Sequence, residues 1–176
     1  VANTYSQAQI NALLSSKQAQ INTLQELVDN LPVEVSQKLV TAATNNTVTP
    51  ASLFTLVIPK AGIYEISAAV RFRTASTTTG IGLGLNAATG EVNAQVEIPQ
   101  AAAGTASFYE GSLTASGGVI LSTAALAANT DYIALIRGSY VAASEETLEV
   151  VFRSEVASSM VTVQANSYIR AREVKS

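Results

Sequence analysis

The residues best suited to chemistry are three glutamates, Glu145, Glu146 and Glu149, with Asp131 in the segment before them. Grouped carboxylates can bind calcium, and two of them at a suitable separation can act as a general acid and base. Their spacing does not follow the Asp-x-Asp pattern of a calcium-binding loop, and acidic loops are often simply solvated. We therefore expect neither a metal site nor a catalytic site.

A second candidate is the glycine-rich run from Gly80 to Gly84. Phosphate-binding loops also need a Gly-Lys-Ser/Thr ending or a three-residue glycine offset, followed by a helix, and none of these features is present. Ile81, Leu83 and Leu85 alternate with glycine instead. This alternation predicts a strand with one bare face that another backbone approaches closely.

Arginines occur twice at i, i+2 spacing, as Arg71 with Arg73 and as Arg170 with Arg172. On a strand, this spacing places both guanidinium groups on one face, where they could contact an anionic sugar or the carboxylates of a neighbouring subunit. We favour pairing with glutamates on adjacent strands. The glutamates concerned are Glu65, Glu149 and Glu155.

The absent residue types exclude much other chemistry. The 176 residues contain no Cys, His or Trp, which excludes disulfides, zinc-thiolate sites and Ser-His triads. The 10 Lys and Arg are scattered among 13 Asp and Glu, which argues against nucleic acid as a partner. We expect no signal peptide, no membrane insertion and no cofactor in a protein that is not an enzyme.

The low charge has a further implication. Only 13% of the residues are charged and 48% are apolar. A monomer with so little charge would have difficulty staying soluble, so we expect part of the apolar surface to lie between subunits.

The composition changes near Pro50, since all 10 glycines follow it. We predict a helical coiled-coil stem and collar over residues 1–46 and a β domain over residues 47–176. The boundary segment includes a glycosylation sequon, Asn45-Asn46-Thr47, which has a meaning only in a eukaryotic secretory pathway.

The first segment has the periodicity of a helix over about three heptads. Ser6 and Gln9 predict a capping box at its start, and Pro32 predicts its end near residue 30. After Pro32 we expect a second short helix or an irregular collar. The apolar seam of the helix consists of Ile10, Leu14, Lys17, Ile21, Leu24, Val28 and Leu31.

Two arrangements would bury this seam: packing of the helix on its own domain, or association with copies of itself. We favour association, because the seam is narrow and the opposite face is polar. Lys17 at a d position is tolerated in such bundles as a register device. The heptads alone do not decide between a dimer and a trimer.

The second segment alternates in the manner of strands separated by turns. The predicted strands are 53–58, 62–73, 80–86, 92–98, 107–115, 119–122, 132–141, 148–152 and 161–174. Because no helical period intervenes, we predict an antiparallel jelly-roll β-sandwich. The strand 132–141 is apolar on both faces, so we expect Ile133, Leu135 and Val141 to contact another subunit of a homotrimer.

Two short segments resemble known families. The run Thr4 to Leu14 resembles a segment that begins the trimeric helical stem of bacteriophage tail fibres, with Gln7, Gln9 and Asn11 in place of the usual charged residues. The run Phe54 to Ser67 is similar to an early part of the C1q/TNF-like jelly roll, with its Pro-x-x-Gly-x-Tyr turn and strand.

The closing run Asn166 to Arg172 looks like the last strand of phage-encoded heads of this type. Together the resemblances imply a homotrimeric fibre or knob on the virion surface, made in the host cytoplasm. Its implied partners are copies of itself, other virion proteins of the tail or capsid, and a host cell-surface glycan or protein. A capsid decoration protein of the same build is the alternative.

Recognition in such a head would fall to loops at the end away from the stem. The longest predicted connections are 74–79, 99–105 and 142–146, and we expect them at that end. The candidate receptor-binding residues on them are Gln100, Ser144, Glu145 and Glu146.

Overall fold

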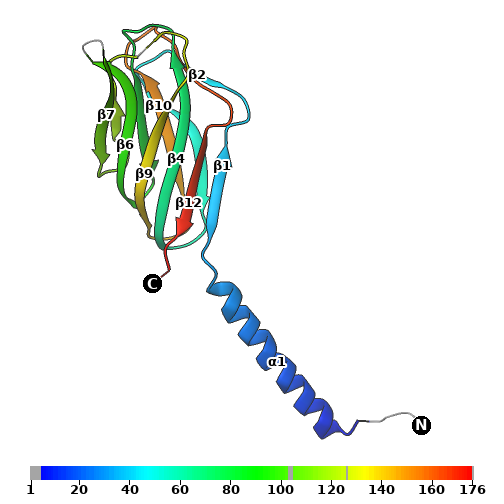
Figure 1. The fold of residues 1–176 in the computed structure, drawn as a ribbon. Helices are drawn as coiled ribbons and strands as arrows, with labels where there is room; N and C mark the ends of the chain where they lie inside the picture. Colours follow the sequence, from blue (N-terminus) through cyan, green and yellow to red (C-terminus); the bar gives the residue numbers. More distant parts are fainter. Residues whose placement is uncertain (1–4, 103–104, 126, 176) are drawn as a thin grey trace. The chain divides into compact units, whose positions relative to one another are not determined.

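The computed structural model describes residues 5–102, 105–125 and 127–175. The chain forms two compact units, Val1–Val33 and Glu34–Ser176 (Figure 1). The units meet at residues 33 and 34 instead of at the predicted 46 and 47, because residues 34–38 and 43–45 belong to a sheet of the second unit.

The first unit contains one helix among its described residues, α1 (Gln7–Asp29). The predicted capping box is present: Gln9 N donates to Ser6 Oγ at 3.3 Å, and Ser6 N donates to Gln9 Oε1 at 2.9 Å. The polar face is linked by hydrogen bonds at i, i+4 spacing, such as that of 3.0 Å from Gln18 to Asn22. In the described part of the chain, no helix is long and apolar enough to cross a membrane.

The second unit consists of strands. They are β1 (Glu34–Lys38), β2 (Ala43–Asn45), β3 (Ala51–Ile58), β4 (Gly62–Thr74), β5 (Ile81–Ala87), β6 (Glu91–Ala102), β7 (Thr105–Leu113), β8 (Val119–Leu121), β9 (Tyr132–Ala142), β10 (Glu146–Ser154), β11 (Val161–Val163) and β12 (Tyr168–Glu173). The predicted strand 161–174 is two strands, because the chain turns between them at Asn166, which has a φ of 70°.

Four antiparallel pairs are nested from the outside inward: β1 with β12, β3 with β10, β4 with β9, and β5 with β8. Successive pairs alternate between a larger sheet (β1-β12-β4-β9-β6-β7) and a smaller sheet (β3-β10-β5-β8). This wrapped ribbon is a jelly roll, as the sequence predicted. β6 and β7 form a hairpin inserted between β5 and β8, and they extend the larger sheet beyond β9 (Figure 1).

The core lies between the two sheets. The alternation predicted for β4 is confirmed, since Tyr64, Ile66 and Phe72 all point inward and are buried. Tyr140 on β9 and Phe152 on β10 are buried beside them in the same cluster. Tyr64 satisfies its hydroxyl by donating to the carbonyl of Lys60 at 3.0 Å.

The glycine run forms β5 and has the bare face that its alternation predicted. A Cβ added to Gly84 would lie 2.2 Å from the carbonyl oxygen of Gly118, so a neighbouring backbone occupies the space of a side chain. At Gly82, the nearest atoms belong to the side chains of Val119 and Arg153. Glycine here permits close packing of strands.

The segment after Pro32 forms β1 and β2, and the second helix or irregular collar predicted there is wrong. β1 pairs with β12, and its Val35 packs against the core, which stabilises an extended chain. Asn45 of the sequon is 7% exposed, and its Nδ2 donates to the carbonyls of Thr49 (3.0 Å) and Phe152 (3.1 Å). This asparagine therefore supports the turn between β2 and β3.

Candidate functional site: the outer face of the larger sheet

The outer face of β9 has three apolar residues, although it does not face the core, and the exposed Arg137 and the half-buried Ser139 lie between two of them on the same face. Ile133 is 55% exposed and Val141 is 39% exposed, while Leu135 between them is half-buried. The opposite face of β9 is buried, as expected, and includes Ile136 and Tyr140. Within the described residues, a central strand of the sheet thus presents apolar side chains on both faces.

Neighbouring strands extend this surface. Leu135 lies opposite Ala69 of β4, which in turn lies opposite Tyr168 of β12, and Tyr168 is 46% exposed. We call Ile133, Leu135, Ala69 and Tyr168 the apolar patch. An exposed apolar patch on a folded domain commonly marks an interaction site.

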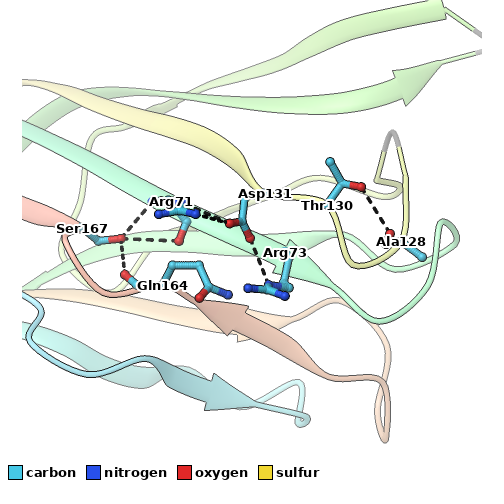
Figure 2. A network of polar contacts seen from close by, with 7 residues as sticks. All are labelled: Arg71, Arg73, Ala128, Thr130, Asp131, Gln164 and Ser167. Carbon is cyan, nitrogen blue, oxygen red and sulfur yellow. Dashed lines mark hydrogen bonds and ion pairs between the residues drawn. The ribbon is translucent and has the colours of Figure 1, made fainter.

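A polar cluster lies beside the patch, where β4 approaches the start of β9 (Figure 2). Both Nε and Nη2 of Arg71 donate to Oδ2 of Asp131, the former at 3.0 Å. Arg73 Nε lies 2.9 Å from Asp131 Oδ1, an ion pair without hydrogen-bond alignment. For Arg71 and Arg73 the predicted pairing with Glu65, Glu149 or Glu155 is wrong, since Asp131 lies directly before β9, next to β4. Arg172 does lie directly opposite Glu65, as predicted, although the two form no ion pair in the described part of the chain.

The hydroxyl of Ser167 secures the same region of β4 (Figure 2). Ser167 Oγ accepts a hydrogen bond from Arg71 N at 2.9 Å and donates to the carbonyl of Gln164 at 2.9 Å. Gln164 N donates to the carbonyl of Arg71 at 2.7 Å. The turn between β11 and β12 therefore fixes the backbone that presents Arg71.

The acidic residues singled out in the sequence do not come together. Asp131 directly precedes Tyr132, and Tyr132 lies opposite Phe72. Glu146 lies opposite Ile58, which is at the other end of the sandwich. Glu149 accepts hydrogen bonds from Ser52, Thr55 and Asn86 on the outer face of the smaller sheet. No three acidic side chains in the described ranges form a group that could hold a metal ion.

The carboxylate of Glu146 is held in place by hydrogen bonds within the fold. Its Oε2 accepts hydrogen bonds from Thr89 N, Thr89 Oγ1 and Gly90 N, and its Oε1 accepts one from Ala143 N. Burial would raise the pKa of Glu146, but the hydrogen bonds from Thr89 and Ala143 outweigh burial and hold the pKa below its ordinary value. The buried Tyr140 hydroxyl lies beside this carboxylate without hydrogen-bond geometry, and burial followed by the carboxylate raises the pKa of Tyr140.

The sandwich has two ends, which we name after Glu34 and Thr74. The loop 75–80 and Gln100, near the end of β6, lie at the Thr74 end, while residues 103 and 104 of the predicted connection 99–105 lie outside the described residues. The loop 143–145 lies at the Glu34 end, contrary to the expectation for Ser144 and Glu145. The reason is that β9 runs antiparallel to β4 and ends with Val141 opposite Ile63.

Some side chains at both ends of the sandwich form hydrogen bonds within the domain. Gln100 Oε1 accepts a hydrogen bond from Thr123 N at 3.3 Å, and Ser144 Oγ donates to the carbonyl of Glu145 at 3.3 Å. At the Thr74 end, the hydroxyls of Thr79 and Ser159 lie 2.6 Å apart. Each end thus has an internal hydrogen-bond network.

The helix seam is exposed along its length. None of the residues of α1 is buried, and Leu24 is 61% exposed. The other apolar seam residues have exposed fractions of 40% (Ile10), 62% (Leu14), 55% (Ile21), 60% (Val28) and 64% (Leu31). Lys17, the polar seam position, donates to Gln20 Oε1 at 3.2 Å.

Sequence reasoning missed two features of the larger sheet. Glu97 and Glu110 lie directly opposite each other on the outer faces of β6 and β7, which only the register of the hairpin reveals. A cleft of about 540 Å³ opens just beyond the end of β7, beside the first residues of β6. Asn93, Ser139 and Val141 help to line it. Asn93, Ser139 and Val141 belong to the ordinary alternation of β6 and β9, so the sequence does not predict a cleft at these residues.

Comparison with known proteins identifies no family. No family model matches the sequence, and no curated protein matches it. The solved structures with similar folds include Eiger TNF from S. frugiperda, with a TM-score of 0.47 and 9% identity over 81% of this chain and 93% of that chain. The fold assignment rests on the nested strand pairs, which define the second unit as a jelly-roll β-sandwich.

The search of solved structures also matched two virus structures. One is that of infectious bursal disease virus, Gx strain, with a TM-score of 0.45 and 10% identity over 82% of this chain and 36% of that chain. The other is the VP2 subviral particle of infectious bursal disease virus, with a TM-score of 0.27 and 12% identity over 83% and 42% of the two chains.

Proposed function

We propose that this chain is a non-enzymatic, homotrimeric structural protein of a bacteriophage particle, a fibre or knob that attaches the particle to its host. The observation that supports this proposal most strongly is the exposed seam of α1. Most of the stability of a helix in a protein comes from packing of its apolar face, and the heptad-spaced apolar residues of α1 would gain that stability by packing against copies of the helix.

The second unit supports the same proposal. Ile133, Leu135 and Val141 lie on the outer face of a central strand, where one chain alone leaves them in contact with water. Burial of this face between heads would complete the trimer that the helices begin. A trimer held by both units would resist dissociation at the surface of a particle.

The attachment role belongs to the Thr74 end in this proposal. The chain joins the sandwich at the Glu34 end, so the opposite loops are free to reach a host surface. The loop 75–80 and the hairpin after Gln100 are rich in small residues, which allow close approach to a glycan or protein. Ser144, Glu145 and Glu146 lie at the other end and are not part of this surface.

An adsorption assay tests the attachment role. Replacing Thr77-Thr78 with Gly-Ser alters the Thr74 end, and replacing Ser144-Glu145 with Gly-Ser is the matched change at the Glu34 end. We expect the first change to reduce adsorption of particles to host cells and the second to leave it unchanged. Normal adsorption with both changes, in particles that contain the protein, would support a capsid decoration protein instead.

A further inference from the structure

The hairpin of β6 and β7 has an acidic outer face. Glu97 and Glu110 lie directly opposite each other, and neither forms an ion pair in the described part of the chain. Like charges in directly opposed positions destabilise a sheet. We call these two residues the acidic pair, and Glu91 adds a third carboxylate to the same face of β6.

Two arginines lie on the outer face at the opposite side of the larger sheet. Arg170 and Arg172 are both exposed on β12, and neither has an ion pair among the described residues. Arg170 lies between Ser36 of β1 and Ser67 of β4, so its directly opposed neighbours offer no carboxylate, whereas Arg172 lies between Glu34 and Glu65. We call Arg170 and Arg172 the arginine pair.

The apolar patch lies between these two pairs. Across the sheet, the strand order β7, β6, β9, β4, β12 places the acidic pair on the first two strands, Ile133 and Leu135 on the third, Ala69 on the fourth and the arginine pair on the fifth (Figure 1). Phe108, which is 64% exposed on the outer face of β7, adds apolar surface next to Glu110. A central apolar area with polar flanks is the usual anatomy of a protein interface.

We infer that a second copy of this chain docks on this face, with the acidic pair of one copy against the arginine pair of the next. The spacings are compatible: Cβ atoms of opposed residues lie roughly 5 Å apart, and side chains at i, i+2 on one strand are roughly 6.6 Å apart. Docking would relieve the repulsion between the two glutamates and cover the apolar patch.

In the homotrimer this contact is head-to-tail, with the acidic pair of each copy on the arginine pair of the next, whereas reciprocal pairing of both flanks would give a two-fold dimer. Repeated head-to-tail contacts close into a ring when the rotation between copies returns to the first copy, here after three. The inference rests on the proposed homotrimer and specifies which surfaces of its heads meet. It also gives Arg170, which has no directly opposed carboxylate, a partner.

Cross-linking tests this contact, since the chain has no cysteine of its own. In the full chain we would combine Glu110→Cys with Arg170→Cys and treat the protein with a short bis-maleimide. We expect covalent species up to the trimer from the double variant and none from either single variant. No cross-linking in the double variant, dimers as its only product, or dimers from Glu110→Cys alone would each overturn the inference.

A charge exchange provides a second readout. Arg170→Glu should weaken association of the full chain about tenfold, and Glu110→Arg in the same chain should restore it. Glu145→Arg, on an exposed loop outside this face, is the matched control and should have no effect. Trimers that are insensitive to Arg170→Glu would overturn the docking alone, whereas a monomeric unmodified chain would overturn the proposed function as well.

Discussion

The carboxylate of Glu146, the first residue of β10, accepts a hydrogen bond from the backbone N–H of Gly90 at 3.2 Å. Gly90 has no room for a side chain, because an added Cβ would lie 2.2 Å from the hydroxyl oxygen of Tyr140. The turn before β6 and the loop before β10 are therefore joined at the Glu34 end. This explains why a glutamate at the very start of a strand is part of the fold.

Glu146→Gln should destabilise the protein at neutral pH by about 1 kcal/mol, the usual contribution of such a hydrogen bond. Because folding lowers the pKa of Glu146, its carboxylate stabilises the protein above the ordinary value of 4.5 and loses this effect as the pH falls below it. Urea unfolding across this range should show the two proteins converging at acid pH. Glu145→Gln is the control, and an equal effect of both changes would contradict this role.

Gly84→Ala should destabilise the sandwich by about 3 kcal/mol, since the new methyl group would meet the Gly118 carbonyl oxygen at 2.2 Å. Gly118→Ala tests the partner position, where the nearest atom to an added Cβ is Leu113 Cδ2 at 3.3 Å. Thermal unfolding should show a much larger loss for Gly84→Ala. Similar melting temperatures for the two variants would mean that β5 is not packed so closely.

Asp131→Asn should have a small effect, below about 1 kcal/mol, because Arg71 and Arg73 are 50% and 40% exposed. The loss should arise from repulsion between two adjacent guanidinium groups, so added salt should reduce it. Unfolding measured at low and high ionic strength tests this. A loss that persists unchanged in high salt would contradict an electrostatic origin.

Leu24→Asp should prevent association of the helices, because a bundle would bury one unpaired carboxylate per chain at several kcal/mol each. The sandwich should keep its β-type circular dichroism, since α1 buries none of its residues within the chain. Asn22→Asp, on the polar face, is the matched control and should leave association intact. Loss of the β signal in Leu24→Asp would show that the two units do not fold independently.

Local signals in the sequence predicted most of the elements. Ser6 and Gln9 identify the start of α1, and alternation identifies β4 together with its buried face. The jelly-roll pairing follows from such strands once their number and turns are known. These features depend on residues that are close in the chain.

The errors concern contacts between distant residues. The partner of Arg71 is Asp131, and only the register of β4 with β9 brings them together. β1 contains few apolar residues and is extended because β12 pairs with it, which its own sequence does not indicate. The cross-strand pair of Glu97 and Glu110 likewise depends on the hairpin register.

Sedimentation equilibrium of the full chain at micromolar concentration tests the central claim most directly. The proposed homotrimer predicts a single species of three times the chain mass of 18.2 kDa, and the Leu24→Asp variant should shift it toward smaller species. An unmodified chain that sediments at 18.2 kDa, with its helix seam and apolar patch exposed to water, would contradict the account.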